Sequence, residues 1–368
     1  MSEIINIELS KKDIQAFQAK LLEWYLAHPR PLPWKETKNA YYIWLSEIIL
    51  QQTRVAQGTP YYYSFVETFP TIQDLASAPE DLIMKKWEGL GYYSRARNLH
   101  TTAKYIVENH GGIFPNTYKE ILNLKGVGPY TAAAIASFAF DLPYAVVDGN
   151  VYRILSRIFG LHAPIDQTQG KKAFTNLAQK LLPKEQAADF NQAIMNFGAT
   201  QCTPKSPDCS KCPFVDNCIA HNGDLIDVLP VKSKKIKKRT RYFHYLIINN
   251  ESKVYIRKRV NKDIWKHLFE FPLIESDELE RNYKKLLASS TLQQLFKIPK
   301  ELISVSKTYQ HILTHQKIHA IFFELTIKDT INTDDFDWIV IERKKLNNFA
   351  FPKLIDCYLS DKALYLNL

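Results

Sequence analysis

Cysteine spacing carries the most specific chemistry in this sequence. Cys202, Cys209, Cys212 and Cys218 follow a C-x6-C-x2-C-x5-C pattern in a short segment that contains prolines and cannot supply its own hydrophobic core. Zinc sites commonly pair two Cys-x-x-Cys knuckles, and this segment has one, whereas four thiolates on a compact loop suit the corners of a cubane. We therefore predict a [4Fe-4S] cluster, with a zinc site as the alternative. The fifth cysteine, Cys357, is expected to be a small buried hydrophobic residue.

A turn that contains two glycines joins two apolar helical segments between Leu124 and Thr131. Gly126 and Gly128 permit positive φ angles, so the turn from Gly126 through Val127 to Gly128 can present backbone amides and a helix start to a phosphate. An ordinary helix–helix turn with glycine at a helix end explains the same residues equally well. The turn by itself leaves both interpretations open.

Two carboxylates are candidates for acid–base chemistry, and the first is Glu47. It lies within Trp44–Leu50, a segment that is apolar on almost every side of a helix. Burial there disfavours the ionised carboxylate and should raise the pKa of Glu47 into the range of a general acid. The alternative is a structural glutamate, paired with Gln51 one turn later or with a basic residue that the fold brings near.

The second carboxylate, Asp148, precedes Gly149 and Asn150 at a turn before another helical segment. An aspartate in this position is a common helix N-cap. Backbone donors and Asn150 are expected to keep the pKa of Asp148 low and its carboxylate ionised. Two carboxyl groups whose pKa values are pushed apart form the pattern that acid–base catalysis uses.

Two regions of different periodicity must position these residues. Between Lys11 and about Thr200, apolar residues recur at three- and four-residue spacing, which predicts consecutive helices and an all-α domain. After residue 241 the period changes, which predicts an α+β domain. The segments predicted as strands are 241–249, 253–260, 317–327 and 337–342, and those predicted as helices are 277–290 and 351–361.

The chain is therefore expected to be multidomain. We predict an all-α domain over residues 1–221, with a helix-hairpin-helix at about 120–140 and a cysteine loop at 202–218. A basic linker over 222–241 follows, and then an α+β domain over 242–368. Half of the net charge of +10 lies in that linker, which carries 7 basic and 2 acidic residues and so fits either nucleic acid binding or a solvated connector.

The composition excludes several classes of protein. With 46% hydrophobic and 23% charged residues, the chain is expected to bury hydrophobic cores, which excludes general disorder, a collagen-like fibre and a disulfide-stapled miniprotein. The sequence contains no apolar run of about 18 residues, and the N-terminus has charges where a signal peptide needs its apolar stretch. We expect a soluble cytoplasmic protein of bacterial type, associated with the nucleoid.

The order of these motifs is similar to that in the helix-hairpin-helix DNA glycosylases of the endonuclease III superfamily. The similarity rests on the Gly-Val-Gly hairpin, the aspartate about twenty residues later and the cysteine loop. Within that superfamily, SEIILQQT, GLGYYSRARNL and VDGNV resemble the adenine DNA glycosylases, the MutY family. The match covers residues from about 20 to 220 densely and the remainder loosely.

This resemblance implies a monofunctional DNA glycosylase of base excision repair. Such an enzyme hydrolyses the N-glycosidic bond of adenine mispaired with 8-oxoguanine or guanine in duplex DNA. Hydrolysis needs an acid that protonates the base and a carboxylate that stabilises a cationic sugar, and Glu47 and Asp148 fit these roles. Related lyases carry a lysine where this chain has Tyr130, and a phenol cannot form an imine, so we expect an abasic product. Tyr130 and Asn150 are expected to form hydrogen bonds near Asp148.

The resemblance also implies which residues contact DNA. The turn at Gly126, Val127 and Gly128 would bind a phosphate. Tyr92 would insert into the base stack, although ordinary core packing is an alternative for this tyrosine. Where relatives often have an arginine after the tryptophan, this chain has Lys35. The residues expected around the extruded adenine are Trp34, Leu50, Gln52 and Gln192, and those expected against the opposite base are Thr53 and Leu90.

For the C-terminal domain the resemblance implies a Nudix-like fold that recognises 8-oxoguanine. Leu313, Thr314 and His315 match a Phe-Ser-His loop, so Thr314 and His315 are expected to contact that base. The domain contains no glycine, so it cannot supply the glycine-containing magnesium box of a Nudix hydrolase, and we expect no pyrophosphatase activity. The alternative is that His311, His315 and His319, spaced by four, form one face of an amphipathic segment.

The expected partner is double-stranded DNA with 8-oxoguanine:adenine or guanine:adenine mispairs, which the protein would bind as a monomer and away from membranes. Two other functions stay open. One is a glycosylase for thymine or another mismatch on the same scaffold. The other is a noncatalytic iron-sulfur protein that binds DNA.

Overall fold

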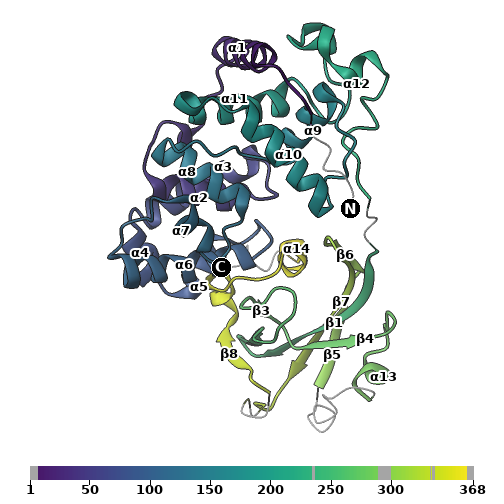
Figure 1. Ribbon diagram of the computed structural model, residues 1–368. Helices are drawn as coiled ribbons and strands as arrows, with labels where there is room; N and C mark the ends of the chain where they lie inside the picture. Colours follow the sequence, from purple (N-terminus) through teal and green to yellow (C-terminus); the bar gives the residue numbers. More distant parts are fainter. Residues whose placement is uncertain (1–6, 234–236, 289–299, 332, 334–335, 363–368) are drawn as a thin grey trace. The chain divides into compact units, whose positions relative to one another are not determined.

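The computed structural model describes residues 7–233, 237–288, 300–331, 333 and 336–362. Within them the backbone groups into two compact units (Figure 1). The first unit combines Met1–Ala76 with Thr101–Lys235, and the second combines Ser77–His100 with Ile236–Leu368. The predicted domain boundaries follow the order of the chain, whereas this grouping takes residues 77–100 out of the helical region and into the second unit.

The first unit is built from helices, as the apolar periodicity predicts, and its turns carry recognisable caps. Helix α1 begins with a capping box, in which the Ser10 hydroxyl accepts from the Asp13 amide and the Asp13 carboxylate accepts from the Ser10 amide. The helices of this unit are α1 (Lys11–Ala27), α2 (Ala40–Leu50), α3 (Val55–Thr68), α4 (Ile72–Ser77), α7 (Tyr118–Asn123), α8 (Pro129–Phe140), α9 (Gly149–Phe159), α10 (Thr168–Leu181), α11 (Ala187–Thr200) and α12 (Ile219–Asn222). Helix α6 (Ser94–His110) runs from the second unit into the first.

The cysteine segment is ordered by the core of this unit, because it contributes one large side chain to that core. Phe214 is buried and stacks on Phe17 of α1 with ring centroids 4.9 Å apart. It also meets Phe197 of α11 edge-on at 5.4 Å. The loop therefore depends on packing against helices that are far from it in sequence, and Phe214→Ala would cost roughly 3 kcal/mol of stability.

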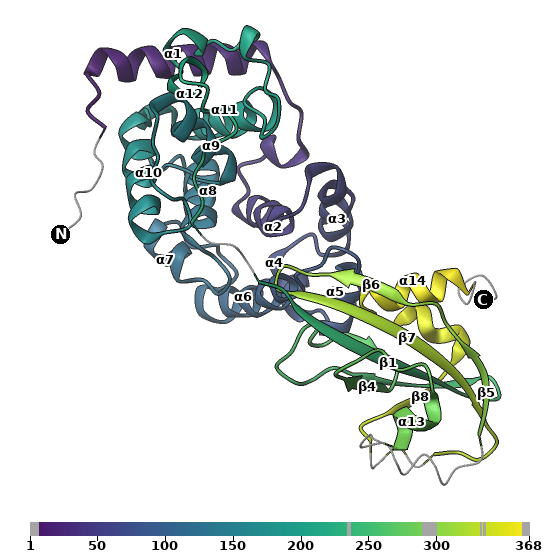
Figure 2. The same ribbon diagram turned by 90° about the vertical axis from the view of Figure 1, so that its right-hand side faces the viewer.

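The second unit contains a mixed sheet in the strand order β3-β2-β1-β7-β5, with β4, β6 and β8 paired to its members. Figure 2 shows β1 and β7 side by side in this sheet. Strands β1 and β7 are long and run parallel, and they form the buried centre of the sheet. Helix α14 packs on it, because Tyr358 stacks on Phe322 of β7 with ring centroids 4.0 Å apart. The strands are β1 (Arg239–Asn250), β2 (Lys253–Lys258), β3 (Phe269–Glu270), β4 (Leu273–Ser276), β5 (Lys300–Val305), β6 (Tyr309–Ile312), β7 (Gln316–Ile327) and β8 (Ile339–Glu342).

The α+β prediction for this region is confirmed, with two local corrections. The helices here are α5 (Glu80–Lys86), α13 (Tyr283–Ala288) and α14 (Lys353–Asp361). Cys357 lies on α14 as predicted but is exposed, because it is on the solvent side of that helix. The alternative in which His311, His315 and His319 form one face of an amphipathic segment is wrong. His311 and His319 lie on the antiparallel strands β6 and β7, and His315 lies in the turn between them.

Residues 77–100 are held to the rest of the second unit by backbone-directed hydrogen bonds. The Glu88 carboxylate accepts from the amide of Phe351 at 2.8 Å. The Arg97 guanidinium donates to the carbonyl of Lys266 at 2.7 Å. The loop between these two residues, which carries Tyr92, is thereby fixed to the unit that contains the sheet.

None of the helices in the described part of the chain is long and apolar enough to cross a membrane.

Candidate active site

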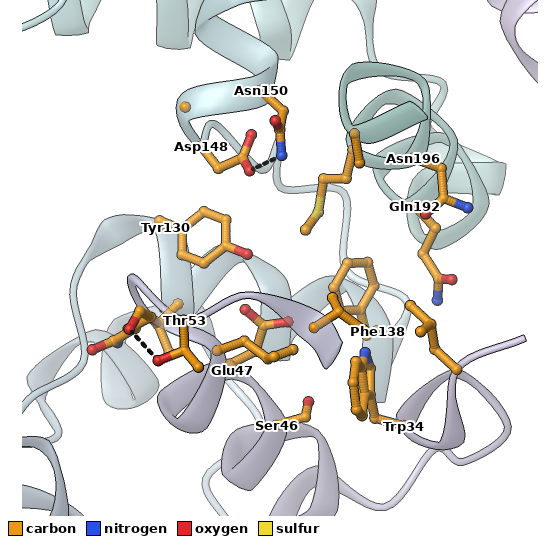
Figure 3. Close-up of a pocket in the computed structure, with 18 of the residues that line it drawn as sticks. Trp34, Ser46, Glu47, Thr53, Tyr130, Phe138, Asp148, Asn150, Gln192 and Asn196 are labelled. Carbon is orange, nitrogen blue, oxygen red and sulfur yellow. Dashed lines mark hydrogen bonds between the residues drawn. The ribbon is translucent and has the colours of Figure 1, made fainter. Parts of the chain in front are cut away.

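A cavity of about 930 Å³ opens in the first unit between helices α2, α8, α9 and α11 and the 3-10 turn η1 (Pro33–Lys35) (Figure 3). Most of the residues that sequence reasoning proposed for catalysis and for holding the base line this one cavity. They are Trp34, Glu47, Leu50, Gln52, Thr53, Gly128, Tyr130, Asp148, Asn150 and Gln192. Segments about one hundred residues apart in the chain are thus brought around one space.

Glu47 lies on the cavity side of α2 and is 6% exposed. Burial raises the pKa of this carboxyl to about 7, and the nearby Asp148 acts in the same direction. The Tyr130 phenol opposes both effects, because it stabilises the ionised form. The expected raised pKa is therefore confirmed, and Glu47 can hold a proton near neutral pH.

Asp148 is the N-cap of α9, as predicted. Its Oδ1 accepts from the Val151 amide at 2.8 Å, and its Oδ2 accepts from the Asn150 side chain at 2.8 Å. The expectation of a low pKa is wrong, however, because burial raises the pKa of Asp148 more than these donors lower it. A carboxylate in such a poorly solvated place interacts strongly with any cation that forms beside it.

Tyr130 is in the first turn of α8 and faces both carboxyl groups. The Glu47 and Asp148 carboxyl groups both act on its phenol. The hydrogen bonds that the Asp148 carboxylate accepts among the described residues come from Val151 and Asn150, so the one expected from Tyr130 is not among them. Burial and the two acids raise the pKa of Tyr130 well above its usual value, so the phenol keeps its proton.

The Asp148 side chain is connected to the cysteine loop through two residues of α9. Asn150 donates to Asp148 and accepts from Arg153 at 2.9 Å. Arg153 also donates to the carbonyls of Cys202 at 2.8 Å and Gly198 at 2.6 Å. Sequence reasoning missed Arg153, although its place three residues after Asn150 on the same helix could have indicated it.

A second arginine of α9, Arg157, fixes the same loop and was also missed. It is 2% exposed and donates to the carbonyls of Thr203, Pro204 and Ile226 at 2.8 to 3.0 Å. A buried arginine needs this number of acceptors, since an unpaired buried charge is strongly unfavourable. The conformation of the cysteine loop is therefore set by α9.

The four cysteines Cys202, Cys209, Cys212 and Cys218 line one small cavity together. Among the described residues, no three His, Cys, Asp or Glu side chains are arranged to hold a single metal ion. The four thiols therefore face one shared space. Four thiolates around such a space are a donor set that suits an iron-sulfur cluster.

The glycine turn forms the predicted helix hairpin between α7 and α8. Gly126 has a φ of 81°, in the left-handed region that glycine favours, and the Val127 amide donates to the carbonyl of Leu124 at 3.1 Å. Gly128 is the N-cap of α8, and a Cβ there would meet no atom within 4 Å. The first turn of α8 is therefore open on this side. Of the three turn residues, Gly128 lines the cavity.

A separate hollow of about 570 Å³ lies in the second unit. It contains the remaining proposed site residues, Leu90, Tyr92, Thr314 and His315. The Tyr92 and Thr314 hydroxyls are hydrogen-bonded at 2.9 Å. Tyr92 has a φ of 47° and is 47% exposed, which rules out ordinary core packing as its role.

Several residues that line the first cavity were not predicted. Helix α11 supplies Met195 and Asn196, three and four positions after Gln192, so helical spacing from Gln192 could have found them. The side-chain nitrogen of Asn196 is buried and has no hydrogen-bond partner among the described residues. The remaining unpredicted residues include Ser46, Phe138 and Arg30.

Two family models match the chain. Residues 45–184 match the HhH-GPD superfamily base excision DNA repair protein, and residues 244–361 match the NUDIX domain. The chain is 40% identical over 259 residues to the adenine DNA glycosylase of Buchnera aphidicola subsp. Baizongia pistaciae, covering 70% of this chain and 73% of that protein. It is 46% identical over 218 residues to the adenine DNA glycosylase of Mus musculus, covering 57% of this chain and 42% of that protein.

Solved structures resemble the helical unit. A thermostable thymine-DNA glycosylase is 31% identical with a TM-score of 0.54, and the match covers 58% of this chain and 98% of that one. An endonuclease III in a non-covalent complex with DNA is 22% identical with a TM-score of 0.51, covering 59% of this chain and 99% of that one. The second likeness concerns the fold alone.

Proposed function

The chain belongs to the adenine DNA glycosylases, which hydrolyse N-glycosyl bonds in base excision repair, and we propose that it removes adenine mispaired with 8-oxoguanine or guanine without cleaving the strand. The observation that carries the proposal is the meeting of Glu47, Tyr130 and Asp148 in one cavity large enough for a nucleoside. These groups lie within a fold whose helices bring them together from separate segments.

Glu47 acts as the acid in this mechanism. With a pKa of about 7 it carries a proton in neutral solution and gives it to a ring nitrogen of adenine. Protonation lets the base leave without developing a full negative charge. Leaving-group departure then produces a sugar with the character of an oxocarbenium ion.

Asp148 stabilises that sugar. Its carboxylate is fixed by the Val151 amide and the Asn150 side chain, so it is already oriented when positive charge develops. Water then adds to the sugar and leaves an abasic site. Tyr130 occupies the place where a lyase needs an amine, and because it keeps its proton it orients Glu47 without attacking the sugar.

Base extrusion brings the adenine into the cavity, at a cost of a few kcal/mol for unstacking. Trp34, Leu50, Gln52 and Gln192 surround the base, and Thr53 contacts the opposite strand's base. The open start of α8 behind Gly126, Val127 and Gly128 binds a DNA phosphate, since helix N-termini favour anions.

The hollow of the second unit recognises the opposite base. Tyr92 is exposed and hydrogen-bonded to Thr314, so its ring is available to enter the base stack. Thr314 and His315 provide polar atoms for 8-oxoguanine, and Leu90 provides an apolar surface. This assignment uses the NUDIX match over residues 244–361 for base recognition.

Cys202, Cys209, Cys212 and Cys218 hold a [4Fe-4S] cluster in this proposal. Held by these four cysteines, such a group would supply structural or electronic support and would leave no iron open for substrate. We keep the limits predicted from the sequence, which are residues 1–221 for the helical domain, 222–241 for the linker and 242–368 for the α+β domain. The protein acts as a monomer in a bacterial-type cytoplasm on double-stranded DNA near the nucleoid.

The test is a strand-cleavage assay on an 8-oxoguanine:adenine duplex, with and without hot alkali after the reaction. We expect cleavage that requires alkali, because hydrolysis leaves an abasic site in an intact strand. Cleavage without alkali contradicts the role of Tyr130. Glu47→Gln should bind the duplex and fail to excise, whereas a noncatalytic DNA-binding protein would have no excision to lose.

The match to a thymine-DNA glycosylase favours a second candidate, excision of thymine opposite guanine. A guanine:thymine duplex in the same assay separates the two. Faster release of thymine than of adenine would replace the proposed substrate.

A further inference from the structure

Three side chains from separate elements meet at one edge of the cavity. Tyr25 on α1 donates a hydrogen bond to Oε1 of Gln192 on α11, at 3.2 Å. Lys35, on the turn η1, places its ammonium 3.4 Å from the Tyr25 hydroxyl and 5.1 Å from the centroid of its ring. Tyr25 does not line the cavity, whereas Lys35 and Gln192 do. Tyr25 therefore contacts the site from behind.

The order of donors in this group is determined by Lys35. An ammonium has donors and no acceptor, so Lys35 can only donate to the phenol oxygen or lie over the ring. The phenol then has its own proton to give, and the Gln192 Oε1 accepts it. Burial raises the pKa of Tyr25, so this proton is retained. Burial and Arg30 lower the pKa of Lys35 to about 8, which leaves it protonated for the most part at pH 7.

A glutamine side chain alone can rotate its amide by half a turn and exchange oxygen for nitrogen. Here that rotation would point the Nε2 donor of Gln192 at the Tyr25 oxygen, which already faces the Lys35 ammonium. The hydrogen bond from Tyr25 therefore selects one orientation, with Oε1 engaged behind and Nε2 free. Figure 3 shows Gln192 reaching from α11 into the cavity on the side of Trp34.

We propose that Tyr25 is a positioning residue of the excision reaction, which fixes the Gln192 carboxamide so that its Nε2 donors face the extruded base. This rests on the proposed seating of adenine in the cavity. N1 of adenine is unprotonated and can accept from such a donor, whereas N1 of guanine and of hypoxanthine carries a proton. Gln192 held in this way recognises an acceptor on the base edge and keeps adenine in register with Glu47.

The test is a double-mutant cycle on single-turnover adenine excision at pH 7, at saturating enzyme, with Tyr25→Phe, Gln192→Ala and the double variant. Each single variant should slow excision about 3- to 10-fold, as expected for one lost hydrogen bond. Because Tyr25 acts through Gln192, Tyr25→Phe should add no further loss in the Gln192→Ala background. The single variants should change the rate of the bound complex more than the affinity for the duplex.

Tyr41→Phe is the matched control. The Tyr41 hydroxyl also donates one hydrogen bond, to the carbonyl of Phe69 at 2.7 Å, but it lies outside the cavity. We expect a similar change in thermal stability and an unchanged excision rate. Losses that multiply in the Tyr25→Phe/Gln192→Ala variant, or a wild-type rate for Tyr25→Phe, would overturn the inference and leave the proposed function standing. A wild-type chain that excises no adenine would overturn both.

Discussion

The phenol of Tyr130 faces the carboxyl group of Glu47 in a cavity that Asp148 also lines. The phenol lowers the pKa of Glu47, and the carboxylate raises the pKa of Tyr130, because a neutral phenol beside an ionised carboxylate is the favoured pair of protonation states. Burial of Glu47 outweighs the effect of the phenol, and its pKa lies at about 7. The site thus combines a carboxylic acid that is protonated near neutrality with a phenol that stays neutral.

The rate of excision should fall as pH rises through about 7, since ionised Glu47 cannot protonate the base. Below that pH Glu47 is protonated, so its ionisation no longer changes the excision rate. Single-turnover excision rates between pH 5.5 and 9 measure this dependence. A rate that climbs steadily across this range would show that Glu47 is not the acid.

Glu47→Gln should stabilise the protein at neutral and higher pH. The folded-state pKa of Glu47 is raised from 4.5 to about 7. The stability that this group contributes is therefore fully present below pH 4.5 and is lost as pH rises through about 7. Glutamine has no charge to bury, and the variant should gain up to about 3 kcal/mol over the wild type above pH 7. Urea denaturation at pH 5 and pH 8 tests this, because the difference between the proteins should be larger at pH 8. An equal difference at both values would contradict the burial of the charge.

Tyr130→Phe should shift the fall in excision rate to higher pH. Without the phenol the ionised form of Glu47 loses a stabilising polar neighbour, so its pKa rises, by about half a unit to one unit. The variant should still leave an alkali-labile abasic site. The measurement is the midpoint of the pH–rate curve compared with that of the wild type, and a shift to lower pH would reverse the assigned effect of the phenol.

Asp148→Asn should separate the two roles of this residue. Asparagine is as good an N-cap as aspartate, so α9 should keep its stability, with the melting temperature close to that of the wild type. Excision should fall by about 100-fold or more, because the neutral amide cannot stabilise a cationic sugar. Thermal melting together with single-turnover kinetics measures both effects. A large loss of stability would indicate that Asp148 is mainly structural.

Thr314→Val should weaken the preference for 8-oxoguanine:adenine over guanine:adenine. Valine keeps the shape of threonine and removes the hydroxyl that binds Tyr92, and the ratio of the two excision rates should fall about 3- to 10-fold. Thr308→Val is the control, since Thr308 accepts from Arg281 in the same unit and does not line the hollow. An unchanged ratio in Thr314→Val would remove Thr314 from the base-recognition site.

Much of this architecture can be predicted from local patterns in the sequence. The apolar spacing predicts the helices from Lys11 to Thr200 because an amphipathic helix must place its apolar residues on one face. Asp148 is identifiable as an N-cap, since a cap is made by residues three positions apart. The cysteine spacing predicts a metal-binding loop for the same reason, because the four thiols lie within one segment.

Other features depend on residues that are distant in sequence. The direction of the pKa shift of Asp148 is set by burial under other helices, and this outweighs the local donors on which its low pKa was predicted. Arg153 gains its role from acceptors at Gly198 and Cys202, which only the packing of α9 against α11 and the cysteine loop brings near it.

The sequence by itself determined the elements, their order and the chemical groups they carry, because hydrogen bonding and side-chain periodicity within a helix or strand are local. Only the tertiary structure decided that Tyr92 bonds to Thr314 and that Tyr25 reaches Gln192. These contacts join residues more than one hundred and fifty positions apart, and no local pattern encodes them. They arise when buried apolar surfaces pack, which also sets the dielectric environment that gives Glu47 its proton.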